Sequence, residues 1–343
     1  MIPKAQLLDL AKQQELQPTT VEKDYVLGWL LYAIAQHDQL SRWVFKGGTC
    51  LKKCFFETYR FSEDLDFSIP EMEPFDENSV RTGLTETTQW VLDESGIEFP
   101  ADGLKVEVYE NKRGKESIQA KVTYIGPLNL PRRSHQRVKF DLTQDEVIAD
   151  TTVARSIFHA YGDALDPVPS ANCYSVNEIL AEKTRALYER EGRARDVYDL
   201  VHLSRNFRDA IDPQTASDVL RRKFAFKELP DPGVEMIIQR VDEDVLRGNW
   251  ENQLAHQLPV LPPVESFLVE LKDAVMWWLE PGNAAKPLPQ VPMKDGEKPV
   301  PRQHFPRSAR RHPSRIGGGE RLRGPPADLS YGYGAMNRIR YAA

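Results

Sequence analysis

The segment Lys46–Ile69, KGGTCLKKCFFETYRFSEDLDFSI, combines a glycine turn, a short helix and an alternating strand, and it decides the expected fold. Its last residues alternate between polar and apolar side chains, which is typical of a strand with one buried face. On such a strand Asp64 and Asp66 project from one face, while Leu65 and Phe67 enter the core. The segment therefore predicts a pair of carboxylates on the polar face of a sheet.

Two neighbouring carboxylates repel each other, and both stay ionised only if a cation lies near them. Mg²⁺ suits Asp64 and Asp66, because proteins hold it with one or two carboxylates plus substrate phosphates. A strand at 136–142, QRVKFDL, carries Asp141 on its polar face. If the two strands pair, Asp141 becomes the third acid of the site. Asp-x-Asp alone is a weak signal, since it also occurs on solvated strand edges.

Lys46-Gly47-Gly48-Thr49 precedes the carboxylates and has the composition of an anion-binding turn. Glycines let the backbone approach phosphate oxygens, Thr49 can donate its hydroxyl, and the next helix offers free N–H groups. Most Gly-Gly turns are only turns. A phosphate-binding turn beside carboxylates, however, is what a nucleoside triphosphate with Mg²⁺ requires.

A second polar cluster is expected in the C-terminal half. Lys183 falls on the apolar stripe of a helix that begins near Asn177, so its ammonium group needs an anionic partner or a path to water. It is either a snorkelling lysine or a phosphate ligand. Asp196 could favour a helix N-terminus or pair with an arginine. Arg190 and its neighbours could bind phosphates or balance nearby glutamates.

The charge distribution argues against binding of duplex DNA over a broad face of the protein. From Pro281 onward the chain has 12 Lys and Arg against 4 Asp and Glu, a balance of +8, which leaves −14 for the other 280 residues. This C-terminal tail holds 10 of the 25 prolines and 8 of the 20 glycines, a composition typical of disorder. It is either a basic arm for RNA or a partner, or an extension without function.

Three cysteines are too few for a disulfide framework. Cys50 and Cys54 lie four residues apart with no histidine close in sequence, so we expect packed or free thiols rather than a zinc site. No apolar run of 18 residues exists and the N-terminus lacks a signal-peptide pattern, which favours a cytoplasmic protein without a membrane span.

The periodicity predicts an α+β chain in which strands alternate with helices. A helix at 19–36 is expected to start with a Thr19–Glu22 capping box. The other expected elements are a short helix in CLKKCFFETY, helices at 78–95, 177–207 with a break at Glu191-Gly192, 215–227, 234–247 and 263–279, and strands at 104–110, 117–125 and 136–142.

Together these residues resemble the AbiEii/AbiGii toxin family of the DNA polymerase β-like nucleotidyltransferase superfamily. Five ordered blocks over roughly the first 210 residues carry the resemblance: VEKDYVLGWLL (Val21–Leu31), VFKGGTCL (Val44–Leu51), RFSEDLDFSI (Arg60–Ile69), EILAEKTRALYER (Glu178–Arg190) and RDVYDLVHL (Arg195–Leu203). Superfamily members with a more common turn carry Gly-Ser where this chain has Gly48-Thr49, and threonine keeps the hydroxyl. The chain after about residue 280 matches nothing in the family.

The resemblance implies a mixed sheet flanked by helices, organised as a nucleotidyltransferase core with N-terminal helices at 1–150, a helical domain closing the cleft at 151–280 and the tail at 281–343. It implies Mg²⁺, with room for two ions, on Asp64 and Asp66, and triphosphate on the Gly48-Thr49 turn. Lys183 and Asp196 correspond to later family motifs, and Asp141 fits the third carboxylate more weakly.

The implied activity is transfer of a nucleotide from an NTP to an acceptor, with RNA and a tRNA 3′ end favoured. The resemblance further implies the toxin of a bacterial toxin–antitoxin or abortive-infection system, with a winged-helix antitoxin encoded alongside. Two alternatives remain open from the residues: transfer of the nucleotide to a protein hydroxyl, and a non-catalytic nucleotide- or partner-binding protein on the same scaffold.

Overall fold

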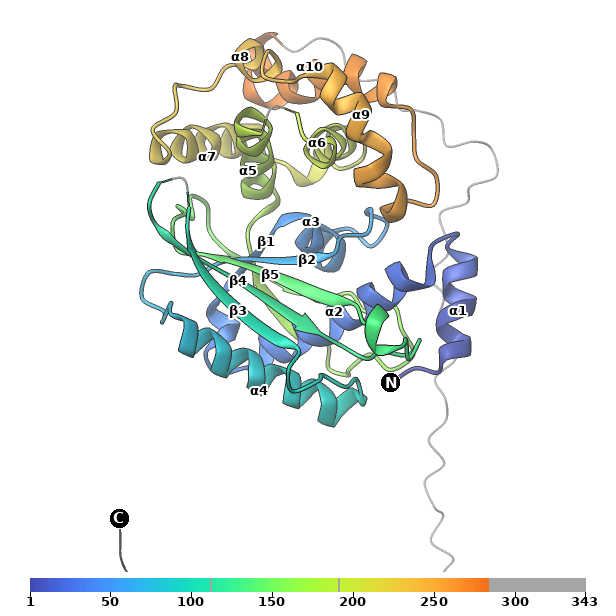
Figure 1. Cartoon of the computed structure of the whole chain (residues 1–343). Coiled ribbons are helices and arrows are strands. Elements are labelled where there is room, and N and C mark those ends of the chain that lie inside the picture. The colour runs from blue at the N-terminus through green and yellow to red at the C-terminus, as the bar shows by residue number, and fades with distance from the viewer. Residues whose placement is uncertain (112, 191, 284–343) are drawn as a thin grey trace, which may run out of the picture. The chain divides into compact units, whose positions relative to one another are not determined.

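A computed structural model describes residues 1–111, 113–190 and 192–283 of the chain (Figure 1). From residue 284 onward the predicted tail lies outside the described residues. No helix in the described part is long and apolar enough to cross a membrane.

The centre of the fold is a mixed seven-stranded sheet with the strand order β3-β4-β5-β2-β1-β7-β6. β2 runs antiparallel to β1 and parallel to β5, and β1 runs parallel to β7. This confirms the predicted α+β class and the strands foreseen from the sequence. The strands are β1 (Val44–Lys46), β2 (Asp64–Ser68), β3 (Leu104–Glu110), β4 (Glu116–Thr123), β5 (Arg137–Thr143), β6 (Val153–Ser156) and β7 (Ser170–Cys173).

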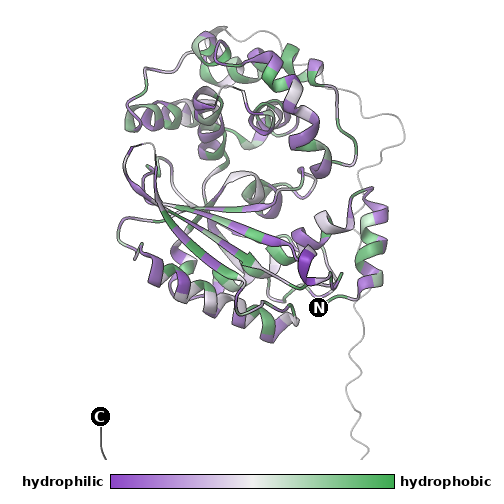
Figure 2. Cartoon of the chain, viewed as in Figure 1, coloured by the Kyte–Doolittle hydropathy of each residue, from purple (hydrophilic) through white to green (hydrophobic). Residues whose placement is uncertain are grey.

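The sheet has one apolar and one polar face, as the alternation in β2 predicts. Leu65 and Phe67 are buried while Asp64 and Asp66 stay partly exposed. Hydrophilic and hydrophobic residues alternate along the strands in Figure 2. Helices α1 (Lys4–Gln13), α2 (Pro18–Gln36) and α4 (Glu77–Ser95) belong to this half of the chain, and α2 and α4 cover the apolar face.

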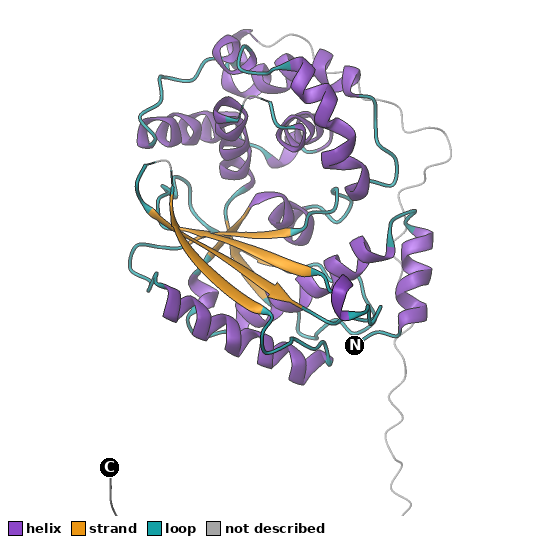
Figure 3. Ribbon diagram, in the orientation of Figure 1, coloured by secondary structure: helices purple, strands orange, loops and turns teal. Residues whose placement is uncertain are grey.

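A group of helices lies across the polar face, on the other side of the sheet from α2 and α4 (Figure 3). They are α5 (Val176–Glu189), α6 (Ala194–Asn206), α7 (Pro213–Phe226), α8 (Val234–Ile238), α9 (Glu243–Leu254) and α10 (Val264–Leu279). Because β6 and β7 follow residue 150 and still join the sheet, we propose that the helical half begins near Tyr174 rather than at 151.

Short helical turns complete the described chain and link these elements. The longest is the π-helix η2 (Leu51–Phe55), which continues directly from α3 (Gly47–Cys50). The others are η1 (Leu40–Arg42), η3 (Arg132–Ser134), η4 (Arg208–Ala210), η5 (Ala255–Gln257) and η6 (Pro281–Asn283).

Two details of the predicted helices are wrong. The Thr19–Glu22 capping box does not form, because α2 starts at Pro18 with Gln17 as its N-cap. The buried Glu22 carboxylate instead accepts the backbone N–H of Leu128 at 2.7 Å, a tertiary contact that local spacing cannot reveal. The predicted helix at 234–247 divides into α8 and α9, and Asp242 caps α9 by accepting the N–H of Val245.

Candidate active site

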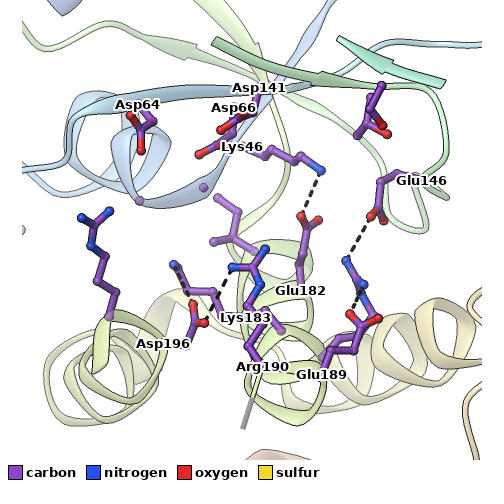
Figure 4. A pocket seen from close by; sticks show the side chains of 18 of the residues that line it. Lys46, Asp64, Asp66, Asp141, Glu146, Glu182, Lys183, Glu189, Arg190 and Asp196 are labelled. Atoms are coloured by element: carbon purple, nitrogen blue, oxygen red, sulfur yellow. Dashed lines mark hydrogen bonds and ion pairs between the residues drawn. The ribbon is translucent and has the colours of Figure 1, made fainter. Parts of the chain in front are cut away.

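The three acids predicted from the sequence lie on adjacent strands. Asp66 of β2 is in direct register with Asp141 of β5, and Asp64 is in register with Lys139. Neighbouring strands lie about 4.8 Å apart, and residues in register project from the same face. Asp64, Asp66 and Asp141 therefore form a row on the polar face, as Figure 4 shows.

The crowding of these acids changes their protonation. Burial, with Asp141 and Asp64 close by, raises the pKa of Asp66 to about 6. Burial also raises the pKa of Asp64, and Asp141 adds to this effect while Lys23 and Lys139 oppose it. The ionised forms of Asp64 and Asp66 are therefore disfavoured, first by burial and then by the neighbouring carboxylates.

Asp141 has two partners on its own sheet. Lys139 Nζ lies 2.7 Å from its Oδ2, and Gln119 Nε2 donates to its Oδ1 at 3.2 Å. Burial alone would lower the pKa of Lys139, but the contact with Asp141 raises it. Lys139 and Gln119 were not singled out in the sequence, although both occupy polar positions of alternating strands.

The glycine turn lies directly against the carboxylates. Gly47 adopts a φ of +81°, and a Cβ at this position would meet Asp66 Oδ2 at 2.4 Å. Only glycine combines this backbone conformation with such a close approach. The turn and the acid row therefore belong to one site.

Thr49 differs from its predicted role. It is buried, and its hydroxyl donates to the backbone carbonyl oxygen of Asp64 at 2.5 Å. That donor is used to fix the turn on β2, so it is not free for a phosphate. The sequence showed the hydroxyl but not its partner, which lies 15 residues further along the chain.

Lys183 lies on the opposite wall of the site, on α5. Its Nζ is 2.5 Å from Asp199 Oδ2 and 3.8 Å from Asp196 Oδ1, both on α6. Its side chain is 11% exposed, so the ammonium does not escape into solvent as a snorkelling lysine would. The two acids hold the ammonium group at the surface of the cleft.

Arg60 anchors this wall to the glycine segment and was not predicted as a site residue. It makes a bidentate pair with Asp199, with both N···O distances at 2.7 Å, and donates to Gln257 Oε1 at 2.6 Å. Although burial alone would raise it, Arg60 and Lys183 hold the pKa of Asp199 below its usual range. Asp199 is therefore a buried, ionised connection between the two halves.

Lys46 makes a second connection between the halves. Its Nζ lies 3.0 Å from Glu182 Oε1 on α5, and Glu182 also contacts Lys223 of α7 at 3.3 Å. Burial would raise the pKa of Glu182, but these two lysines lower it. Glu182 had no signal in the sequence beyond its place next to Lys183.

A cleft of about 770 Å³ lies between the two walls. Figure 4 shows the acid row on the sheet side, with Lys183, Asp196 and Arg190 on the helix side. Arg190 is 55% exposed, and its Nη1 lies 3.9 Å from Asp196 Oδ2. Arg193 and Arg195 also line the cleft, so its walls offer both carboxylates and cations.

Comparison with known families identifies the chain. A family model described as "Nucleotidyl transferase AbiEii toxin, Type IV TA system" matches residues 29–280. The chain belongs to this family. It is an AbiEii nucleotidyltransferase toxin, which confirms the resemblance drawn from the five sequence blocks.

The AbiEii chain is also similar to a solved structure, the MenT4 nucleotidyltransferase toxin from Mycobacterium tuberculosis H37Rv. The two share 20% sequence identity with a TM-score of 0.49, and the match covers 82% of this chain and 90% of MenT4. Comparison with curated proteins gives no match.

Proposed function

We propose that this AbiEii toxin transfers a nucleotide from an NTP to an RNA acceptor in a Mg²⁺-dependent reaction. The observation that carries the proposal is the convergence of Asp64, Asp66 and Asp141 beside the Gly47 turn, across the cleft from Lys183. An anion-binding turn, acids and a cation in one cleft are the requirements of a metal-bound triphosphate.

The acid row fits Mg²⁺ by its chemistry. Its donors are hard carboxylate oxygens, and a bound dication would offset the burial and the neighbouring carboxylates that raise the pKa of Asp66. Asp64 and Asp66 would hold one ion, and Asp141 would either join them as ligand of a second ion or act as the base. Bound metal would neutralise charge that develops on the phosphates during in-line displacement.

The cations on the helix wall would bind the triphosphate. Lys183 is placed for this by Asp199 and Asp196, so we assign it to a phosphate and assign Asp196 to positioning it. Arg190 at the cleft surface would contribute a second cation. Lys46 and the backbone of Gly47, Gly48 and Thr49 would form the floor, with Lys46 oriented by Glu182.

Catalysis would then come mainly from position and electrostatics. The acceptor hydroxyl must lie in line with the bond that breaks, and Asp141 is a candidate base to receive its proton. Asp141 lines the cleft, and contacts with Lys139 and Gln119 orient its carboxylate on the sheet surface.

RNA is the proposed class of acceptor, and the particular acceptor that we propose is the 3′ end of a tRNA. The exposed Arg190 at the cleft, with Arg193 and Arg195, supplies cations for a phosphate backbone beyond the NTP. Such an acceptor would place the toxin in the cytoplasm. We propose a winged-helix antitoxin as the partner that restrains it.

The test is incubation of the purified protein with each labelled NTP, Mg²⁺ and total RNA. We expect label in an RNA band, and its loss with EDTA or in Asp64→Ala and Asp66→Ala variants. Label appearing only when a protein extract replaces RNA would move the acceptor to a protein hydroxyl. Nucleotide binding without transfer to either acceptor would support a non-catalytic binding protein, especially if a variant with both Asp64→Ala and Asp66→Ala remained toxic to cells.

A further inference from the structure

All three cysteines of the chain meet at one buried point outside the candidate active site. Cys50 ends α3, Cys54 lies in η2, and Cys173 ends β7. Their Sγ atoms lie within 4.8 Å of one another, and the residues are 0%, 1% and 0% exposed. The cluster could not be predicted from local spacing, because Cys173 is more than a hundred residues away in sequence from Cys50 and Cys54.

The fold brings the cluster together through β1. Cys173 is the register partner of Phe45 in the parallel pair of β7 and β1, and Tyr174 donates its N–H to Phe45 at 2.9 Å. β1 leads into α3, so Cys50 and Cys54 follow within one helical segment. Phe56 donates to the carbonyl of Leu51 at 2.8 Å, a five-residue step that makes this turn a π-helix. Cys54 lies inside that turn.

A basic side chain of β6 lies beside the segment that carries Cys54. Arg155 donates its Nε to the Cys54 carbonyl at 3.2 Å and stacks on Phe55 at 4.8 Å. A cation is thus fixed beside the sulfur cluster.

Three sulfur donors select a soft ion. Among the described residues no histidine or carboxylate joins the group, whereas zinc in structural sites takes four ligands. Thiolates also reject Mg²⁺, which prefers oxygen. A monovalent soft cation such as Cu(I) accepts three thiolates without a fourth ligand and suits a site that is closed to water.

We propose that Cys50, Cys54 and Cys173 form a closed trithiolate site for a Cu(I)-class cation. Binding would displace the thiol protons, which would leave to solvent. Cys50 belongs to the same four-residue helix as Gly47, so an occupied site would fix the glycine turn against β7. That last link rests on the proposed function, but metal binding itself does not.

The test is anaerobic titration of reduced, full-length protein with Cu(I) in competition with a chromophoric Cu(I) chelator. We expect one equivalent to be removed from the chelator. Cys173→Ala should weaken binding by more than the about 10- to 100-fold that outer-shell changes cause. Met72→Leu is the control, because Met72 also carries a soft sulfur ligand, is 92% exposed and has no role in either proposed site.

Melting temperature provides a second, independent readout. Cu(I) should raise it in the parent and in Met72→Leu, and should leave it unchanged in a variant with all three cysteines replaced by alanine. A parent protein that removes no Cu(I) from the chelator overturns the proposal, and the cluster is then a set of packed thiols only. Equal binding by the parent and the folded triple variant overturns it as well. Neither result depends on nucleotide transfer.

Discussion

Gly47 and Asp66 lie so close that a Cβ on the glycine would sit 2.4 Å from the Oδ2 of the aspartate. The glycine turn ends β1 and the aspartate lies on the neighbouring strand, where Lys46 is the register partner of Asp66. The contact explains why one short segment carries residues suited to anions and residues suited to cations. Phosphate and metal would be bound on the two sides of this contact.

Gly47→Ala should therefore abolish transfer while leaving most of the protein folded. The substitution adds roughly 1–3 kcal/mol of backbone strain at φ +81° and pushes a methyl group into the Asp66 carboxylate. Transfer assays and NTP binding by calorimetry check this. Gly114→Ala is the control, since Gly114 has φ +68° but nothing within 4 Å of the added Cβ. Equal activity in the two variants would contradict a functional role for the close approach.

Asp66→Asn should separate activity from stability. It removes a charge from a crowded row, so the melting temperature without metal should stay the same or rise. Transfer should fall by about 10²–10³-fold, as after loss of one electrostatic stabilising group. Asp102→Asn is the matched control, because Asp102 is 73% exposed and pairs with Arg132 at the surface. A marked loss of stability in Asp66→Asn, with unchanged transfer, would mean that the aspartate is structural.

Arg60 and Lys183 both contact Asp199, but replacing them should have different effects: one on stability and the other on NTP affinity. Arg60→Ala breaks a buried bidentate pair and should cost about 3–5 kcal/mol in the free energy of unfolding. Lys183→Ala leaves that pair intact, so we expect less than about 2 kcal/mol but a large loss of NTP affinity. Denaturant unfolding and nucleotide titration measure the two effects.

The exposed pair Arg81–Glu77 supplies the control for these variants, and Arg81→Ala should change stability by less than about 1 kcal/mol. If Lys183→Ala lowered stability as much as Arg60→Ala and left NTP affinity unchanged, Lys183 would be a structural ion-pair partner rather than a phosphate ligand.

The sequence was sufficient to predict the acid row. Alternation placed Asp64, Asp66 and Asp141 on polar faces, and only the pairing of β2 with β5 had to be assumed. The alternation of polar and apolar residues shows which face of a strand each side chain projects from, because successive side chains in a strand point to opposite faces.

The wall opposite the acids could not be predicted in the same way. Arg60 and Asp199 are separated by 139 residues, and Lys46 meets Glu182 across the two halves. Such pairs depend on how helices pack over the sheet, which no local spacing records. For the same reason the sequence alone predicts a phosphate as the partner of the Thr49 hydroxyl, whereas its partner in the structure is the backbone carbonyl of Asp64.

His202 should make stability depend on pH. Its ring lies between Tyr198 at 5.3 Å and Tyr59 at 5.2 Å, and its buried Nε2 has no hydrogen-bond partner among the described residues. Burial lowers its pKa to about 4; Arg205 and Arg60 act in the same direction, and Asp199 opposes them. The unfolded chain takes up this proton near pH 6.5, before the folded protein does.

Stability from His202 is therefore complete above about pH 6.5 and is lost progressively as the pH falls toward 4, by up to about 3 kcal/mol. Unfolding in denaturant at a series of pH values measures this loss. His202→Phe keeps an aromatic ring and should show a smaller decline across that window, whereas His135→Gln, outside this aromatic group, should follow the parent. Parallel curves for the parent and His202→Phe would show that His202 is not the group that titrates.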